Sequence, residues 1–254
     1  MKKTALITGA TSGLGFEFVR LFAKDGYNLV LVARNDKKLE EIKRTYPNLE
    51  VTAISKDLSI HGAAKEVFDE IETRGIDIDV LVNNAGFGLM GKFEELNFQK
   101  QLNMIQLNIS ALTELTYYCL QKMKQKNSGR ILNVASTAAF QPGPKMAVYY
   151  ATKAYVLSFS EALVEELSGS NVTVTTLCPG PTKTNFGAVA SVEGTKMFSR
   201  AMASDLVAKQ GYEALKSGKR VIVTGGFNKA GALGAKFMPR SLAAKIAKYV
   251  AGEK

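Results

Sequence analysis

Two side chains suited to acid–base chemistry, Tyr149 and Lys153, lie four residues apart, so a helix over this segment would place both on one face. A free tyrosine has a pKa of about 10 and is a poor acid or base near neutral pH. An ammonium group about 4 Å away favours the phenolate and can lower that pKa by about 3 units. The pair therefore predicts a phenol activated for proton transfer, with a surface helix of chance Tyr–Lys spacing as the alternative.

A serine and a second tyrosine accompany this pair. Ser136 follows the apolar segment 130–135 and lies thirteen residues before Tyr149. Its hydroxyl can hydrogen-bond a substrate oxygen on which negative charge develops. Tyr150 is three residues from Lys153, so it could also neighbour that lysine on a helix.

Glycines dominate the first turn of the chain, which reads Thr-Gly-Ala-Thr-Ser-Gly-Leu-Gly over residues 8–15. They permit a tight turn and a close approach of the backbone to a pyrophosphate. The amphipathic segment that follows predicts a helix, whose first N–H groups and dipole favour an anion. We expect a dinucleotide site here, and a turn without a ligand is the alternative. The expected contacts are Gly9, Thr11, Ser12, Gly13, Leu14 and Gly15.

The end of the second predicted strand indicates which dinucleotide is bound. Enzymes that use NAD place an acidic residue there to hydrogen-bond the ribose 2′-OH, whereas a nearby arginine accommodates a 2′-phosphate. Here the chain reads Ala33-Arg34-Asn35, without a carboxylate. The guanidinium of Arg34 can hold a phosphate bidentately, which predicts NADP(H) rather than NAD(H). A solvated surface arginine is the alternative.

Short, continuous apolar segments alternate with segments of helical period, such as 98–125 and 149–167. This alternation predicts an α/β fold: a Rossmann-type, doubly wound parallel β-sheet flanked by helices on both faces. We expect a single domain over 1–254, with an insertion at about 180–219 over the edge of the sheet where ligands bind. The predicted strands are 4–8, 28–33, 50–55, 78–83, 130–135, 172–178 and 220–224.

Composition excludes several classes of protein. The chain has 254 residues, 46% of them apolar and 22% charged, as expected for a globular protein with a full core. Its one histidine, His61, predicts neither a metal site nor Ser-His-Asp chemistry. Cys119 and Cys178 are interpreted as buried thiols in a reducing cytoplasm. The apolar stretch at 5–7 is too short for a signal peptide, and no run is long enough for a membrane span.

Together these motifs resemble those of the short-chain dehydrogenase/reductase family, and the resemblance covers nearly the whole chain. The family's spacing selects Tyr149 rather than Tyr150. The segments at 86–88 and 140–144 resemble NADP-preferring bacterial members near hydroxysteroid and 3-ketoacyl reductases. The further matching motifs are Asp57-Leu58 after the third predicted strand, Asn-Asn-Ala-Gly at 83–86, Asn108 in a long predicted helix, and Pro179-Gly180 followed by Thr184.

The resemblance implies a role for each of these residues. Tyr149 would act as general acid–base, and Lys153 would lower its pKa and hold the nicotinamide ribose. Ser136 would bind the substrate oxygen, and Asn108 would support a water-linked proton relay to Lys153. The implied cofactor contacts are Asp57 and Leu58 at the adenine, Asn84, Ala85 and Gly86 at the adenosine ribose and neighbouring backbone, and Thr184 at the carboxamide with Pro179, Gly180 and Thr182 beside it.

Structural roles are the alternative for several of these residues. Asn83 and Asn84 could bond the local backbone after a strand, and Asn108 could cap or kink its helix. Thr182 and Thr184 could be ordinary loop hydroxyls.

The predicted substrate loops are mostly apolar and rich in methionine, which favours a hydrophobic carbonyl or alcohol over a sugar or a small acid. A place in the core is the alternative for these side chains. The candidates are Phe87, Gly88, Leu89, Met90, Phe93, residues 140–146, Phe186, Val189, Met197, Phe198 and Met202.

Basic charge is concentrated in the last quarter of the chain. Residues 196–254 carry 12 basic and 3 acidic side chains, a net charge of +9 of the chain's +10. The segment 239–251 predicts an amphipathic helix docked through an apolar stripe, with its basic face solvated. Attraction of an anionic substrate and binding at an anionic membrane surface are alternatives, and no nucleic-acid module is expected. The stripe consists of Leu242, Ile246, Tyr249 and Val250.

These patterns predict an NADP(H)-dependent oxidoreductase that transfers hydride between the nicotinamide and a carbonyl or secondary alcohol. A dinucleotide-binding sensor or scaffold without turnover is the alternative, although such a protein does not need the proton chain of Ser136, Tyr149 and Lys153. In the family, helices such as 98–125 and 149–167 pair across a two-fold axis. The resemblance therefore implies a homodimer or homotetramer.

Overall fold

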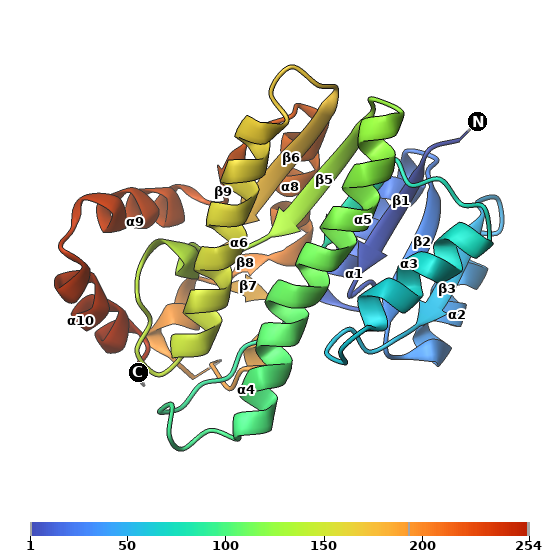
Figure 1. Ribbon diagram of the computed structural model, residues 1–254. Helices are drawn as coiled ribbons and strands as arrows, with labels where there is room; N and C mark the ends of the chain where they lie inside the picture. Colours follow the sequence, from blue (N-terminus) through green and yellow to red (C-terminus); the bar gives the residue numbers. More distant parts are fainter. Residues whose placement is uncertain (1, 193, 253–254) are drawn as a thin grey trace.

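A seven-stranded parallel β-sheet forms the centre of the computed structural model, which describes residues 2–192 and 194–252 (Figure 1). The strands lie in the order β3-β2-β1-β4-β5-β6-β9. The predicted fold class and all seven predicted strands are confirmed. The short apolar runs were a good guide because strands covered on both faces have this pattern. The strands are β1 (Thr4–Thr8), β2 (Asn28–Ala33), β3 (Val51–Ser55), β4 (Val80–Asn83), β5 (Gly129–Val134), β6 (Val172–Cys178) and β9 (Val221–Val223).

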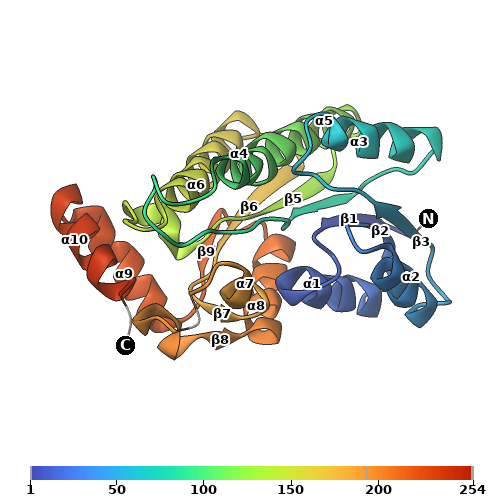
Figure 2. The same ribbon diagram turned by 90° about the horizontal axis from the view of Figure 1, so that it is seen from below.

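Helices cover both faces of this sheet (Figure 2). Strand β1 pairs with β2 on one side and with β4 on the other, so the sheet is extended in opposite directions from this point. Ligands of doubly wound sheets bind at this switch, beyond the carboxyl ends of the strands. One face carries α1 (Gly13–Lys24), α2 (Asp36–Thr45) and α8 (Ser204–Lys216), and the other carries α3 (Ala63–Thr73), α5 (Leu112–Gln125) and α6 (Ala147–Glu166).

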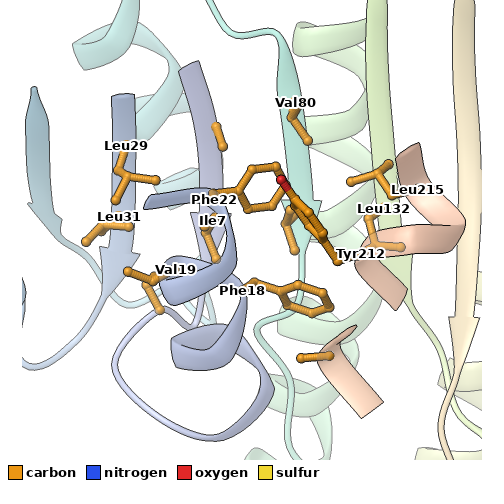
Figure 3. Packing of buried hydrophobic residues seen from close by; sticks show 14 of the residues in the cluster. Ile7, Phe18, Val19, Phe22, Leu29, Leu31, Val80, Leu132, Tyr212 and Leu215 are labelled. Carbon is orange, nitrogen blue, oxygen red and sulfur yellow. The ribbon is translucent and has the colours of Figure 1, made fainter. Parts of the chain in front are cut away.

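Large apolar side chains fill the space between α1, α8 and the sheet (Figure 3). Phe18 and Phe22 of α1 are buried in the same cluster as Ile7 of β1. Tyr212 of α8 meets Phe22 edge to face, with ring centroids 4.8 Å apart, and its hydroxyl donates to the Asp25 carboxylate at 2.8 Å. The ring thus adds apolar burial while its polar end stays bonded. This packing fixes α1, and with it the turn that leads from β1 into the helix.

The expected insertion at 180–219 is shorter than predicted. Strand β7 (Thr182–Lys183), helix α7 (Phe186–Val189) and strand β8 (Met202–Ala203) form a small layer after β6, in which β7 pairs with β8. Residues 204–216, in contrast, are α8, which covers the sheet beside α1. The predicted insertion was therefore wrong for residues 204–216. The apolar residues of α8 have helical spacing, but they directly follow an apolar loop, so the pattern does not separate the two.

The long helix predicted over 98–125 contains a local change of pitch. Helix α4 (Phe98–Ile105) passes into a π-helical turn at Gln106–Ala111, which continues into α5. Asn108 is buried in this turn. Since π-helical turns are rare and occur mainly at functional sites, the position of Asn108 supports a role near the site.

The chain ends in two helices, α9 (Gly226–Phe237) and α10 (Arg240–Val250), which lie at one end of the molecule (Figures 1 and 2). The helix predicted at 239–251 is confirmed, but its predicted docking through the apolar stripe is wrong. Ala243, Ala247 and Ala251 are buried, whereas Leu242 and Ile246 are exposed. The alanine face of α10 is therefore the buried one, and its larger side chains lie outside. Among the described residues, no helix has both the length and the apolar character needed to cross a bilayer.

Candidate active site

The turn between β1 and α1 has the tight backbone that its glycines predicted. Gly9 and Gly13 have φ angles of +66° and +53°, at which other residues are strained. A Cβ atom on Gly15 would lie 2.2 Å from the Gly9 carbonyl oxygen. The missing side chains therefore let α1 begin directly against the end of β1.

The first turn of α1 offers a place for an anion. Ser12 precedes the helix with an extended backbone, and its side chain makes no capping hydrogen bond. The first N–H groups of a helix have no partner within it, and the helix dipole favours negative charge there. The turn therefore fits the pyrophosphate of a dinucleotide. The residues that would hold it are Gly9, Thr11, Ser12, Gly13 and Leu14.

A continuous cleft of about 1120 Å³ runs from this turn across the carboxyl ends of the strands. It brings together Ser136, Tyr149, Lys153 and nearly all the predicted cofactor contacts. Gly15 and Asn108 are predicted site residues that do not line it. The cofactor residues that line it are Gly9, Thr11, Ser12, Gly13, Leu14, Arg34, Asp57, Leu58, Asn84, Ala85, Gly86, Pro179, Gly180, Thr182 and Thr184.

Ser136, Tyr149 and Lys153 meet in one part of this cleft. Ser136 follows β5, and its hydroxyl donates to the Pro179 carbonyl at 3.4 Å. Tyr149 and Lys153 lie one turn apart on α6, as their spacing predicted. The Lys153 ammonium donates to the Val134 carbonyl at 2.8 Å and lies 5.8 Å from the centre of the Tyr149 ring. The fold therefore assembles the predicted trio from β5 and α6.

Burial changes the pKa of both acid–base groups. It raises the pKa of the Tyr149 phenol, and the hydrogen bond with Ser136 opposes this rise only in part. It lowers the pKa of the Lys153 ammonium to about 8. The pKa of Tyr149 is therefore raised overall, because the phenol loses hydration and the Lys153 ammonium bonds a backbone carbonyl. That Lys153 lowers the pKa of Tyr149 relative to burial alone stays a prediction.

Tyr150 also lines the cleft, but its surroundings differ from those of Tyr149. Gly143 is so close that a Cβ atom there would lie 2.2 Å from the Tyr150 ring. Burial raises the pKa of Tyr150 without an opposing hydrogen bond. Of the two, Tyr149 is the one that interacts with both Ser136 and Lys153 in the described structure.

Asn108 links two elements behind the cleft. Its side chain accepts from the Phe87 N–H at 3.2 Å, and donates to the Phe87 carbonyl at 3.0 Å and to the Thr152 hydroxyl at 3.1 Å. A Cβ atom on Gly86 would lie 2.9 Å from Asn108 Oδ1 and 3.6 Å from Lys153 Nζ. The π-helical turn thus joins the loop after β4 to α6 beside Lys153.

The two asparagines after β4 bond the protein itself. The Asn84 amide donates to the Thr8 carbonyl at 2.8 Å. The Asn83 amide donates to Thr116 and Asn133, both at 2.9 Å. Both asparagines therefore have structural bonds, but neither bonds the local backbone after β4 that the structural alternative named. Asn84 also lines the cleft, so a cofactor contact there stays a prediction.

The loop after β6 lies against the glycine turn. A Cβ atom on Gly13 would lie 3.1 Å from the Thr184 side chain, so the glycine makes room for this loop. Thr182 donates to the Gly180 carbonyl at 2.9 Å, and the Thr184 hydroxyl accepts from the Phe186 N–H at 3.2 Å. These bonds shape the loop, and the cofactor contacts of the two threonines stay predictions.

Cations gather where β2 and β3 end. Arg34 is largely exposed and lies 4.0 Å from the Asp57 carboxylate. Lys37 and Lys56, which the sequence patterns did not single out, also line the cleft. Ala33 and its partner Ser55 are paired in the sheet, so the segments carrying these cations leave it side by side. The nearness of both lysines to predicted strand ends is the signal that could have identified them.

Apolar side chains line the cleft around Tyr149. The Phe186 ring lies 5.4 Å from the Tyr149 ring, centre to centre. Val192 and Leu107 line the cleft without having been predicted, since their positions gave no functional signal. The Met197 side chain lies outside the described residues. Of the other predicted substrate residues, Phe87, Leu89, Met146, Phe186 and Val189 line the cleft, whereas Gly88, Met90, Phe93, residues 140–145, Phe198 and Met202 do not.

Comparison with known proteins identifies the class of protein that this fold and site define. The family model described as short chain dehydrogenase matches residues 3–193, so the chain belongs to the short-chain dehydrogenase/reductase family. The uncharacterized oxidoreductase YvrD of Bacillus subtilis is 36% identical over 197 residues, which cover 76% of this chain and 73% of that protein. The chain is therefore an oxidoreductase of this NAD(P)-binding family.

Solved structures share the fold over nearly the whole chain. A 7beta-hydroxysteroid dehydrogenase is 26% identical with a TM-score of 0.84 over 96% of both chains. A short-chain dehydrogenase from Sphingobium yanoikuyae in complex with NADPH is 29% identical, with a TM-score of 0.81 over 91% of this chain and 92% of that one. One from Burkholderia phymatum in complex with NAD is 25% identical, with the same TM-score and coverage.

Proposed function

We propose that this protein is an NADP(H)-dependent oxidoreductase that interconverts a hydrophobic carbonyl compound and its secondary alcohol, with Tyr149 as general acid–base. One observation carries the proposal: Ser136, Tyr149 and Lys153 meet beside an apolar wall, in the cleft that begins at the glycine turn. A binding module needs the turn, but it does not need the proton chain.

When bound, the nicotinamide supplies or accepts the hydride. The Ser136 hydroxyl hydrogen-bonds the substrate oxygen where negative charge develops, and Tyr149 gives that oxygen its proton. Burial raises the pKa of Tyr149, so the phenol is protonated at neutral pH and holds the proton that carbonyl reduction needs. The Lys153 ammonium, near the Tyr149 ring, stabilises the phenolate that is left. Asn108 holds the loop beside Lys153, where a water-linked proton relay would end.

The cations at the ends of β2 and β3 support NADP(H) over NAD(H). Arg34 lies where a 2′-phosphate would be held, and Ala33 offers no carboxylate for a ribose hydroxyl. Replacing Arg34 with alanine is expected to raise KM for NADPH about tenfold through loss of a charge-assisted hydrogen bond, and to leave KM for NADH nearly unchanged. Steady-state kinetics with both cofactors measure this, with Arg44→Ala on the exposed side of α2 as the matched control.

Equal loss of affinity for both cofactors, or a wild-type preference for NADH, would contradict the assignment of Arg34.

The apolar wall around Tyr149 supports a bulky, hydrophobic substrate, and so does the likeness to a 7beta-hydroxysteroid dehydrogenase. NADPH oxidation should be followed with steroidal and cyclic ketones, medium-chain aldehydes and 3-ketoacyl thioesters, with ketoses and 2-keto acids as polar controls. We expect kcat/KM at least about tenfold higher for the hydrophobic compounds, since each buried methylene contributes about 0.8 kcal/mol. NADPH binding without turnover of any compound would instead support the sensor or scaffold.

We further propose that copies associate through α4, α5 and α6 into a homodimer or homotetramer. These helices expose Leu102, Ile105, Tyr117 and Tyr155, which supports a partner on that face. A cytoplasmic location is supported by Cys119 and Cys178, which are buried and unpaired, as expected in a reducing compartment.

A further inference from the structure

The two consecutive helices α9 and α10, residues 226–250 and here termed the hairpin, present large apolar side chains to solvent. Phe227 and Phe237 of α9 are 70% and 83% exposed. With Leu233 they occupy about one third of the helix circumference. On α10, Leu242 and Ile246 are exposed and one turn apart. These five residues are termed the hairpin patch, and isolated surface residues of this size are ordinary whereas a group of them marks an interaction site.

The charge of the hairpin has a single sign. Residues 226–252 contain no aspartate or glutamate. Residues 1–195, in contrast, have a net charge of only +1. Apolar and basic side chains are therefore combined on two helices that carry no negative charge. The basic residues are Lys229, Lys236, Arg240, Lys245 and Lys248.

Helix α9 of the hairpin contacts the segment around Arg200 and the short helix after Ser136. The Arg200 guanidinium lies 4.6 Å from the centre of the Phe227 ring, and the Lys236 ammonium lies 5.7 Å from that of Phe140. Phe140 ends the short helix that begins directly after Ser136. A surface that binds the hairpin would therefore lie near the loops around the active site.

We propose that the hairpin binds the surface of an anionic lipid bilayer, with the hairpin patch at the boundary between headgroups and acyl chains. Apolar residues combined with lysine and arginine are what such surfaces attract. A two-fold contact between copies through this region would bring cations of like sign together, which disfavours a second copy as the partner. Helices of 12 and 11 residues are at most about 18 Å long, too short to span a bilayer core about 30 Å thick, so each would lie along the surface.

Vesicle flotation with the full chain tests this proposal. Vesicles of phosphatidylcholine alone are compared with vesicles that contain one third phosphatidylglycerol. We expect the wild type to bind the anionic vesicles only. The double variant Phe237→Ser/Ile246→Ser should bind at least about tenfold more weakly, because apolar area is lost from the boundary. Lys245→Gln/Lys248→Gln should bind about thirtyfold more weakly, since each cation near an anionic membrane surface contributes substantially to the free energy of binding.

Two control variants alter exposed residues of the same kinds outside the hairpin. Ile60→Ser/Leu206→Ser and Lys209→Gln/Lys219→Gln should bind as the wild type does, and all four variants should keep wild-type NADPH turnover. No binding by the wild type, or full binding by Phe237→Ser/Ile246→Ser, would overturn the proposal. Light scattering, which measures the oligomeric state, tests whether a second copy of the chain binds the hairpin patch instead. If the hairpin variants form a smaller oligomer than the wild type and still bind vesicles normally, the proposal is wrong.

Discussion

Replacing Tyr149 with phenylalanine is expected to lower kcat/KM for carbonyl reduction at least about a thousandfold. The change removes the phenol oxygen and keeps the ring, which packs 5.4 Å from the Phe186 ring, so the cleft should persist. Without the phenol, nothing in the proposed mechanism gives the substrate oxygen its proton. Steady-state NADPH oxidation with the best substrate measures the loss. NADPH binding, measured by fluorescence titration, should weaken by no more than about threefold.

Tyr150→Phe is the matched control, since Tyr150 is adjacent, lines the same cleft and is equally buried. We expect it to keep most of the wild-type activity, because the Tyr149 ring, not that of Tyr150, is the one near Lys153 in the described structure. Loss of turnover in Tyr150→Phe with activity retained in Tyr149→Phe would reverse the assignment.

Replacing Lys153 with methionine is expected to remove most of the activity and yet to stabilise the fold at neutral pH. Burial lowers the pKa of Lys153 from 10.5 to about 8, so the buried ammonium costs about 3 kcal/mol relative to an ordinary lysine. Methionine has a similar length and no charge. It leaves the Val134 carbonyl without its donor, which costs about 1 kcal/mol. We therefore expect the free energy of unfolding to rise by about 2 kcal/mol at pH 7.

The pH dependence of this difference has a definite sign. The folded protein loses the Lys153 proton near pH 8, whereas the unfolded chain keeps it to about pH 10.5. The unfolded state thus binds more protons in this window, and wild-type stability rises with pH relative to the variant. Urea unfolding at pH 7 and pH 9.5 should show the advantage of Lys153→Met shrinking. An advantage that is absent at pH 7, or that grows with pH, would contradict a buried, charged lysine.

The parts of the fold that could be predicted from the sequence are those in which one local pattern decides the structure. Strands such as β1 and β2 are continuous apolar runs because helices cover both faces of the sheet. Gly9 and Gly13 predicted the tight turn between β1 and α1, because glycine readily adopts the left-handed backbone found at both positions.

The errors arose where packing chooses between equivalent patterns. In α10 both an alanine face and a leucine–isoleucine stripe repeat with helical spacing. Which of the two faces is buried depends on the rest of the fold, not on the spacing. The predicted insertion wrongly includes α8 for a similar reason, because the apolar face of this helix is defined by α1 and the sheet. The π-helical turn at Gln106–Ala111 has no local signal in the sequence, because the Asn108 side chain in it bonds Phe87 and Thr152, which are distant along the chain.

Residue identities in the candidate site were more predictable than their electrostatics. Motif spacing placed Ser136, Tyr149 and Lys153 together, since a helix puts residues four apart on one face. The direction in which the pKa of Tyr149 moves depends on burial, which no spacing shows.

The most direct test of the account is a single transfer of label. The best carbonyl substrate is reduced with NADPH that carries deuterium at the reactive position of the nicotinamide, and the alcohol is analysed by mass spectrometry and NMR. We expect one deuterium on the carbinol carbon with the wild type, and almost no labelled alcohol with Tyr149→Phe. Bound NADPH that never delivers its label to any hydrophobic carbonyl compound would contradict the account.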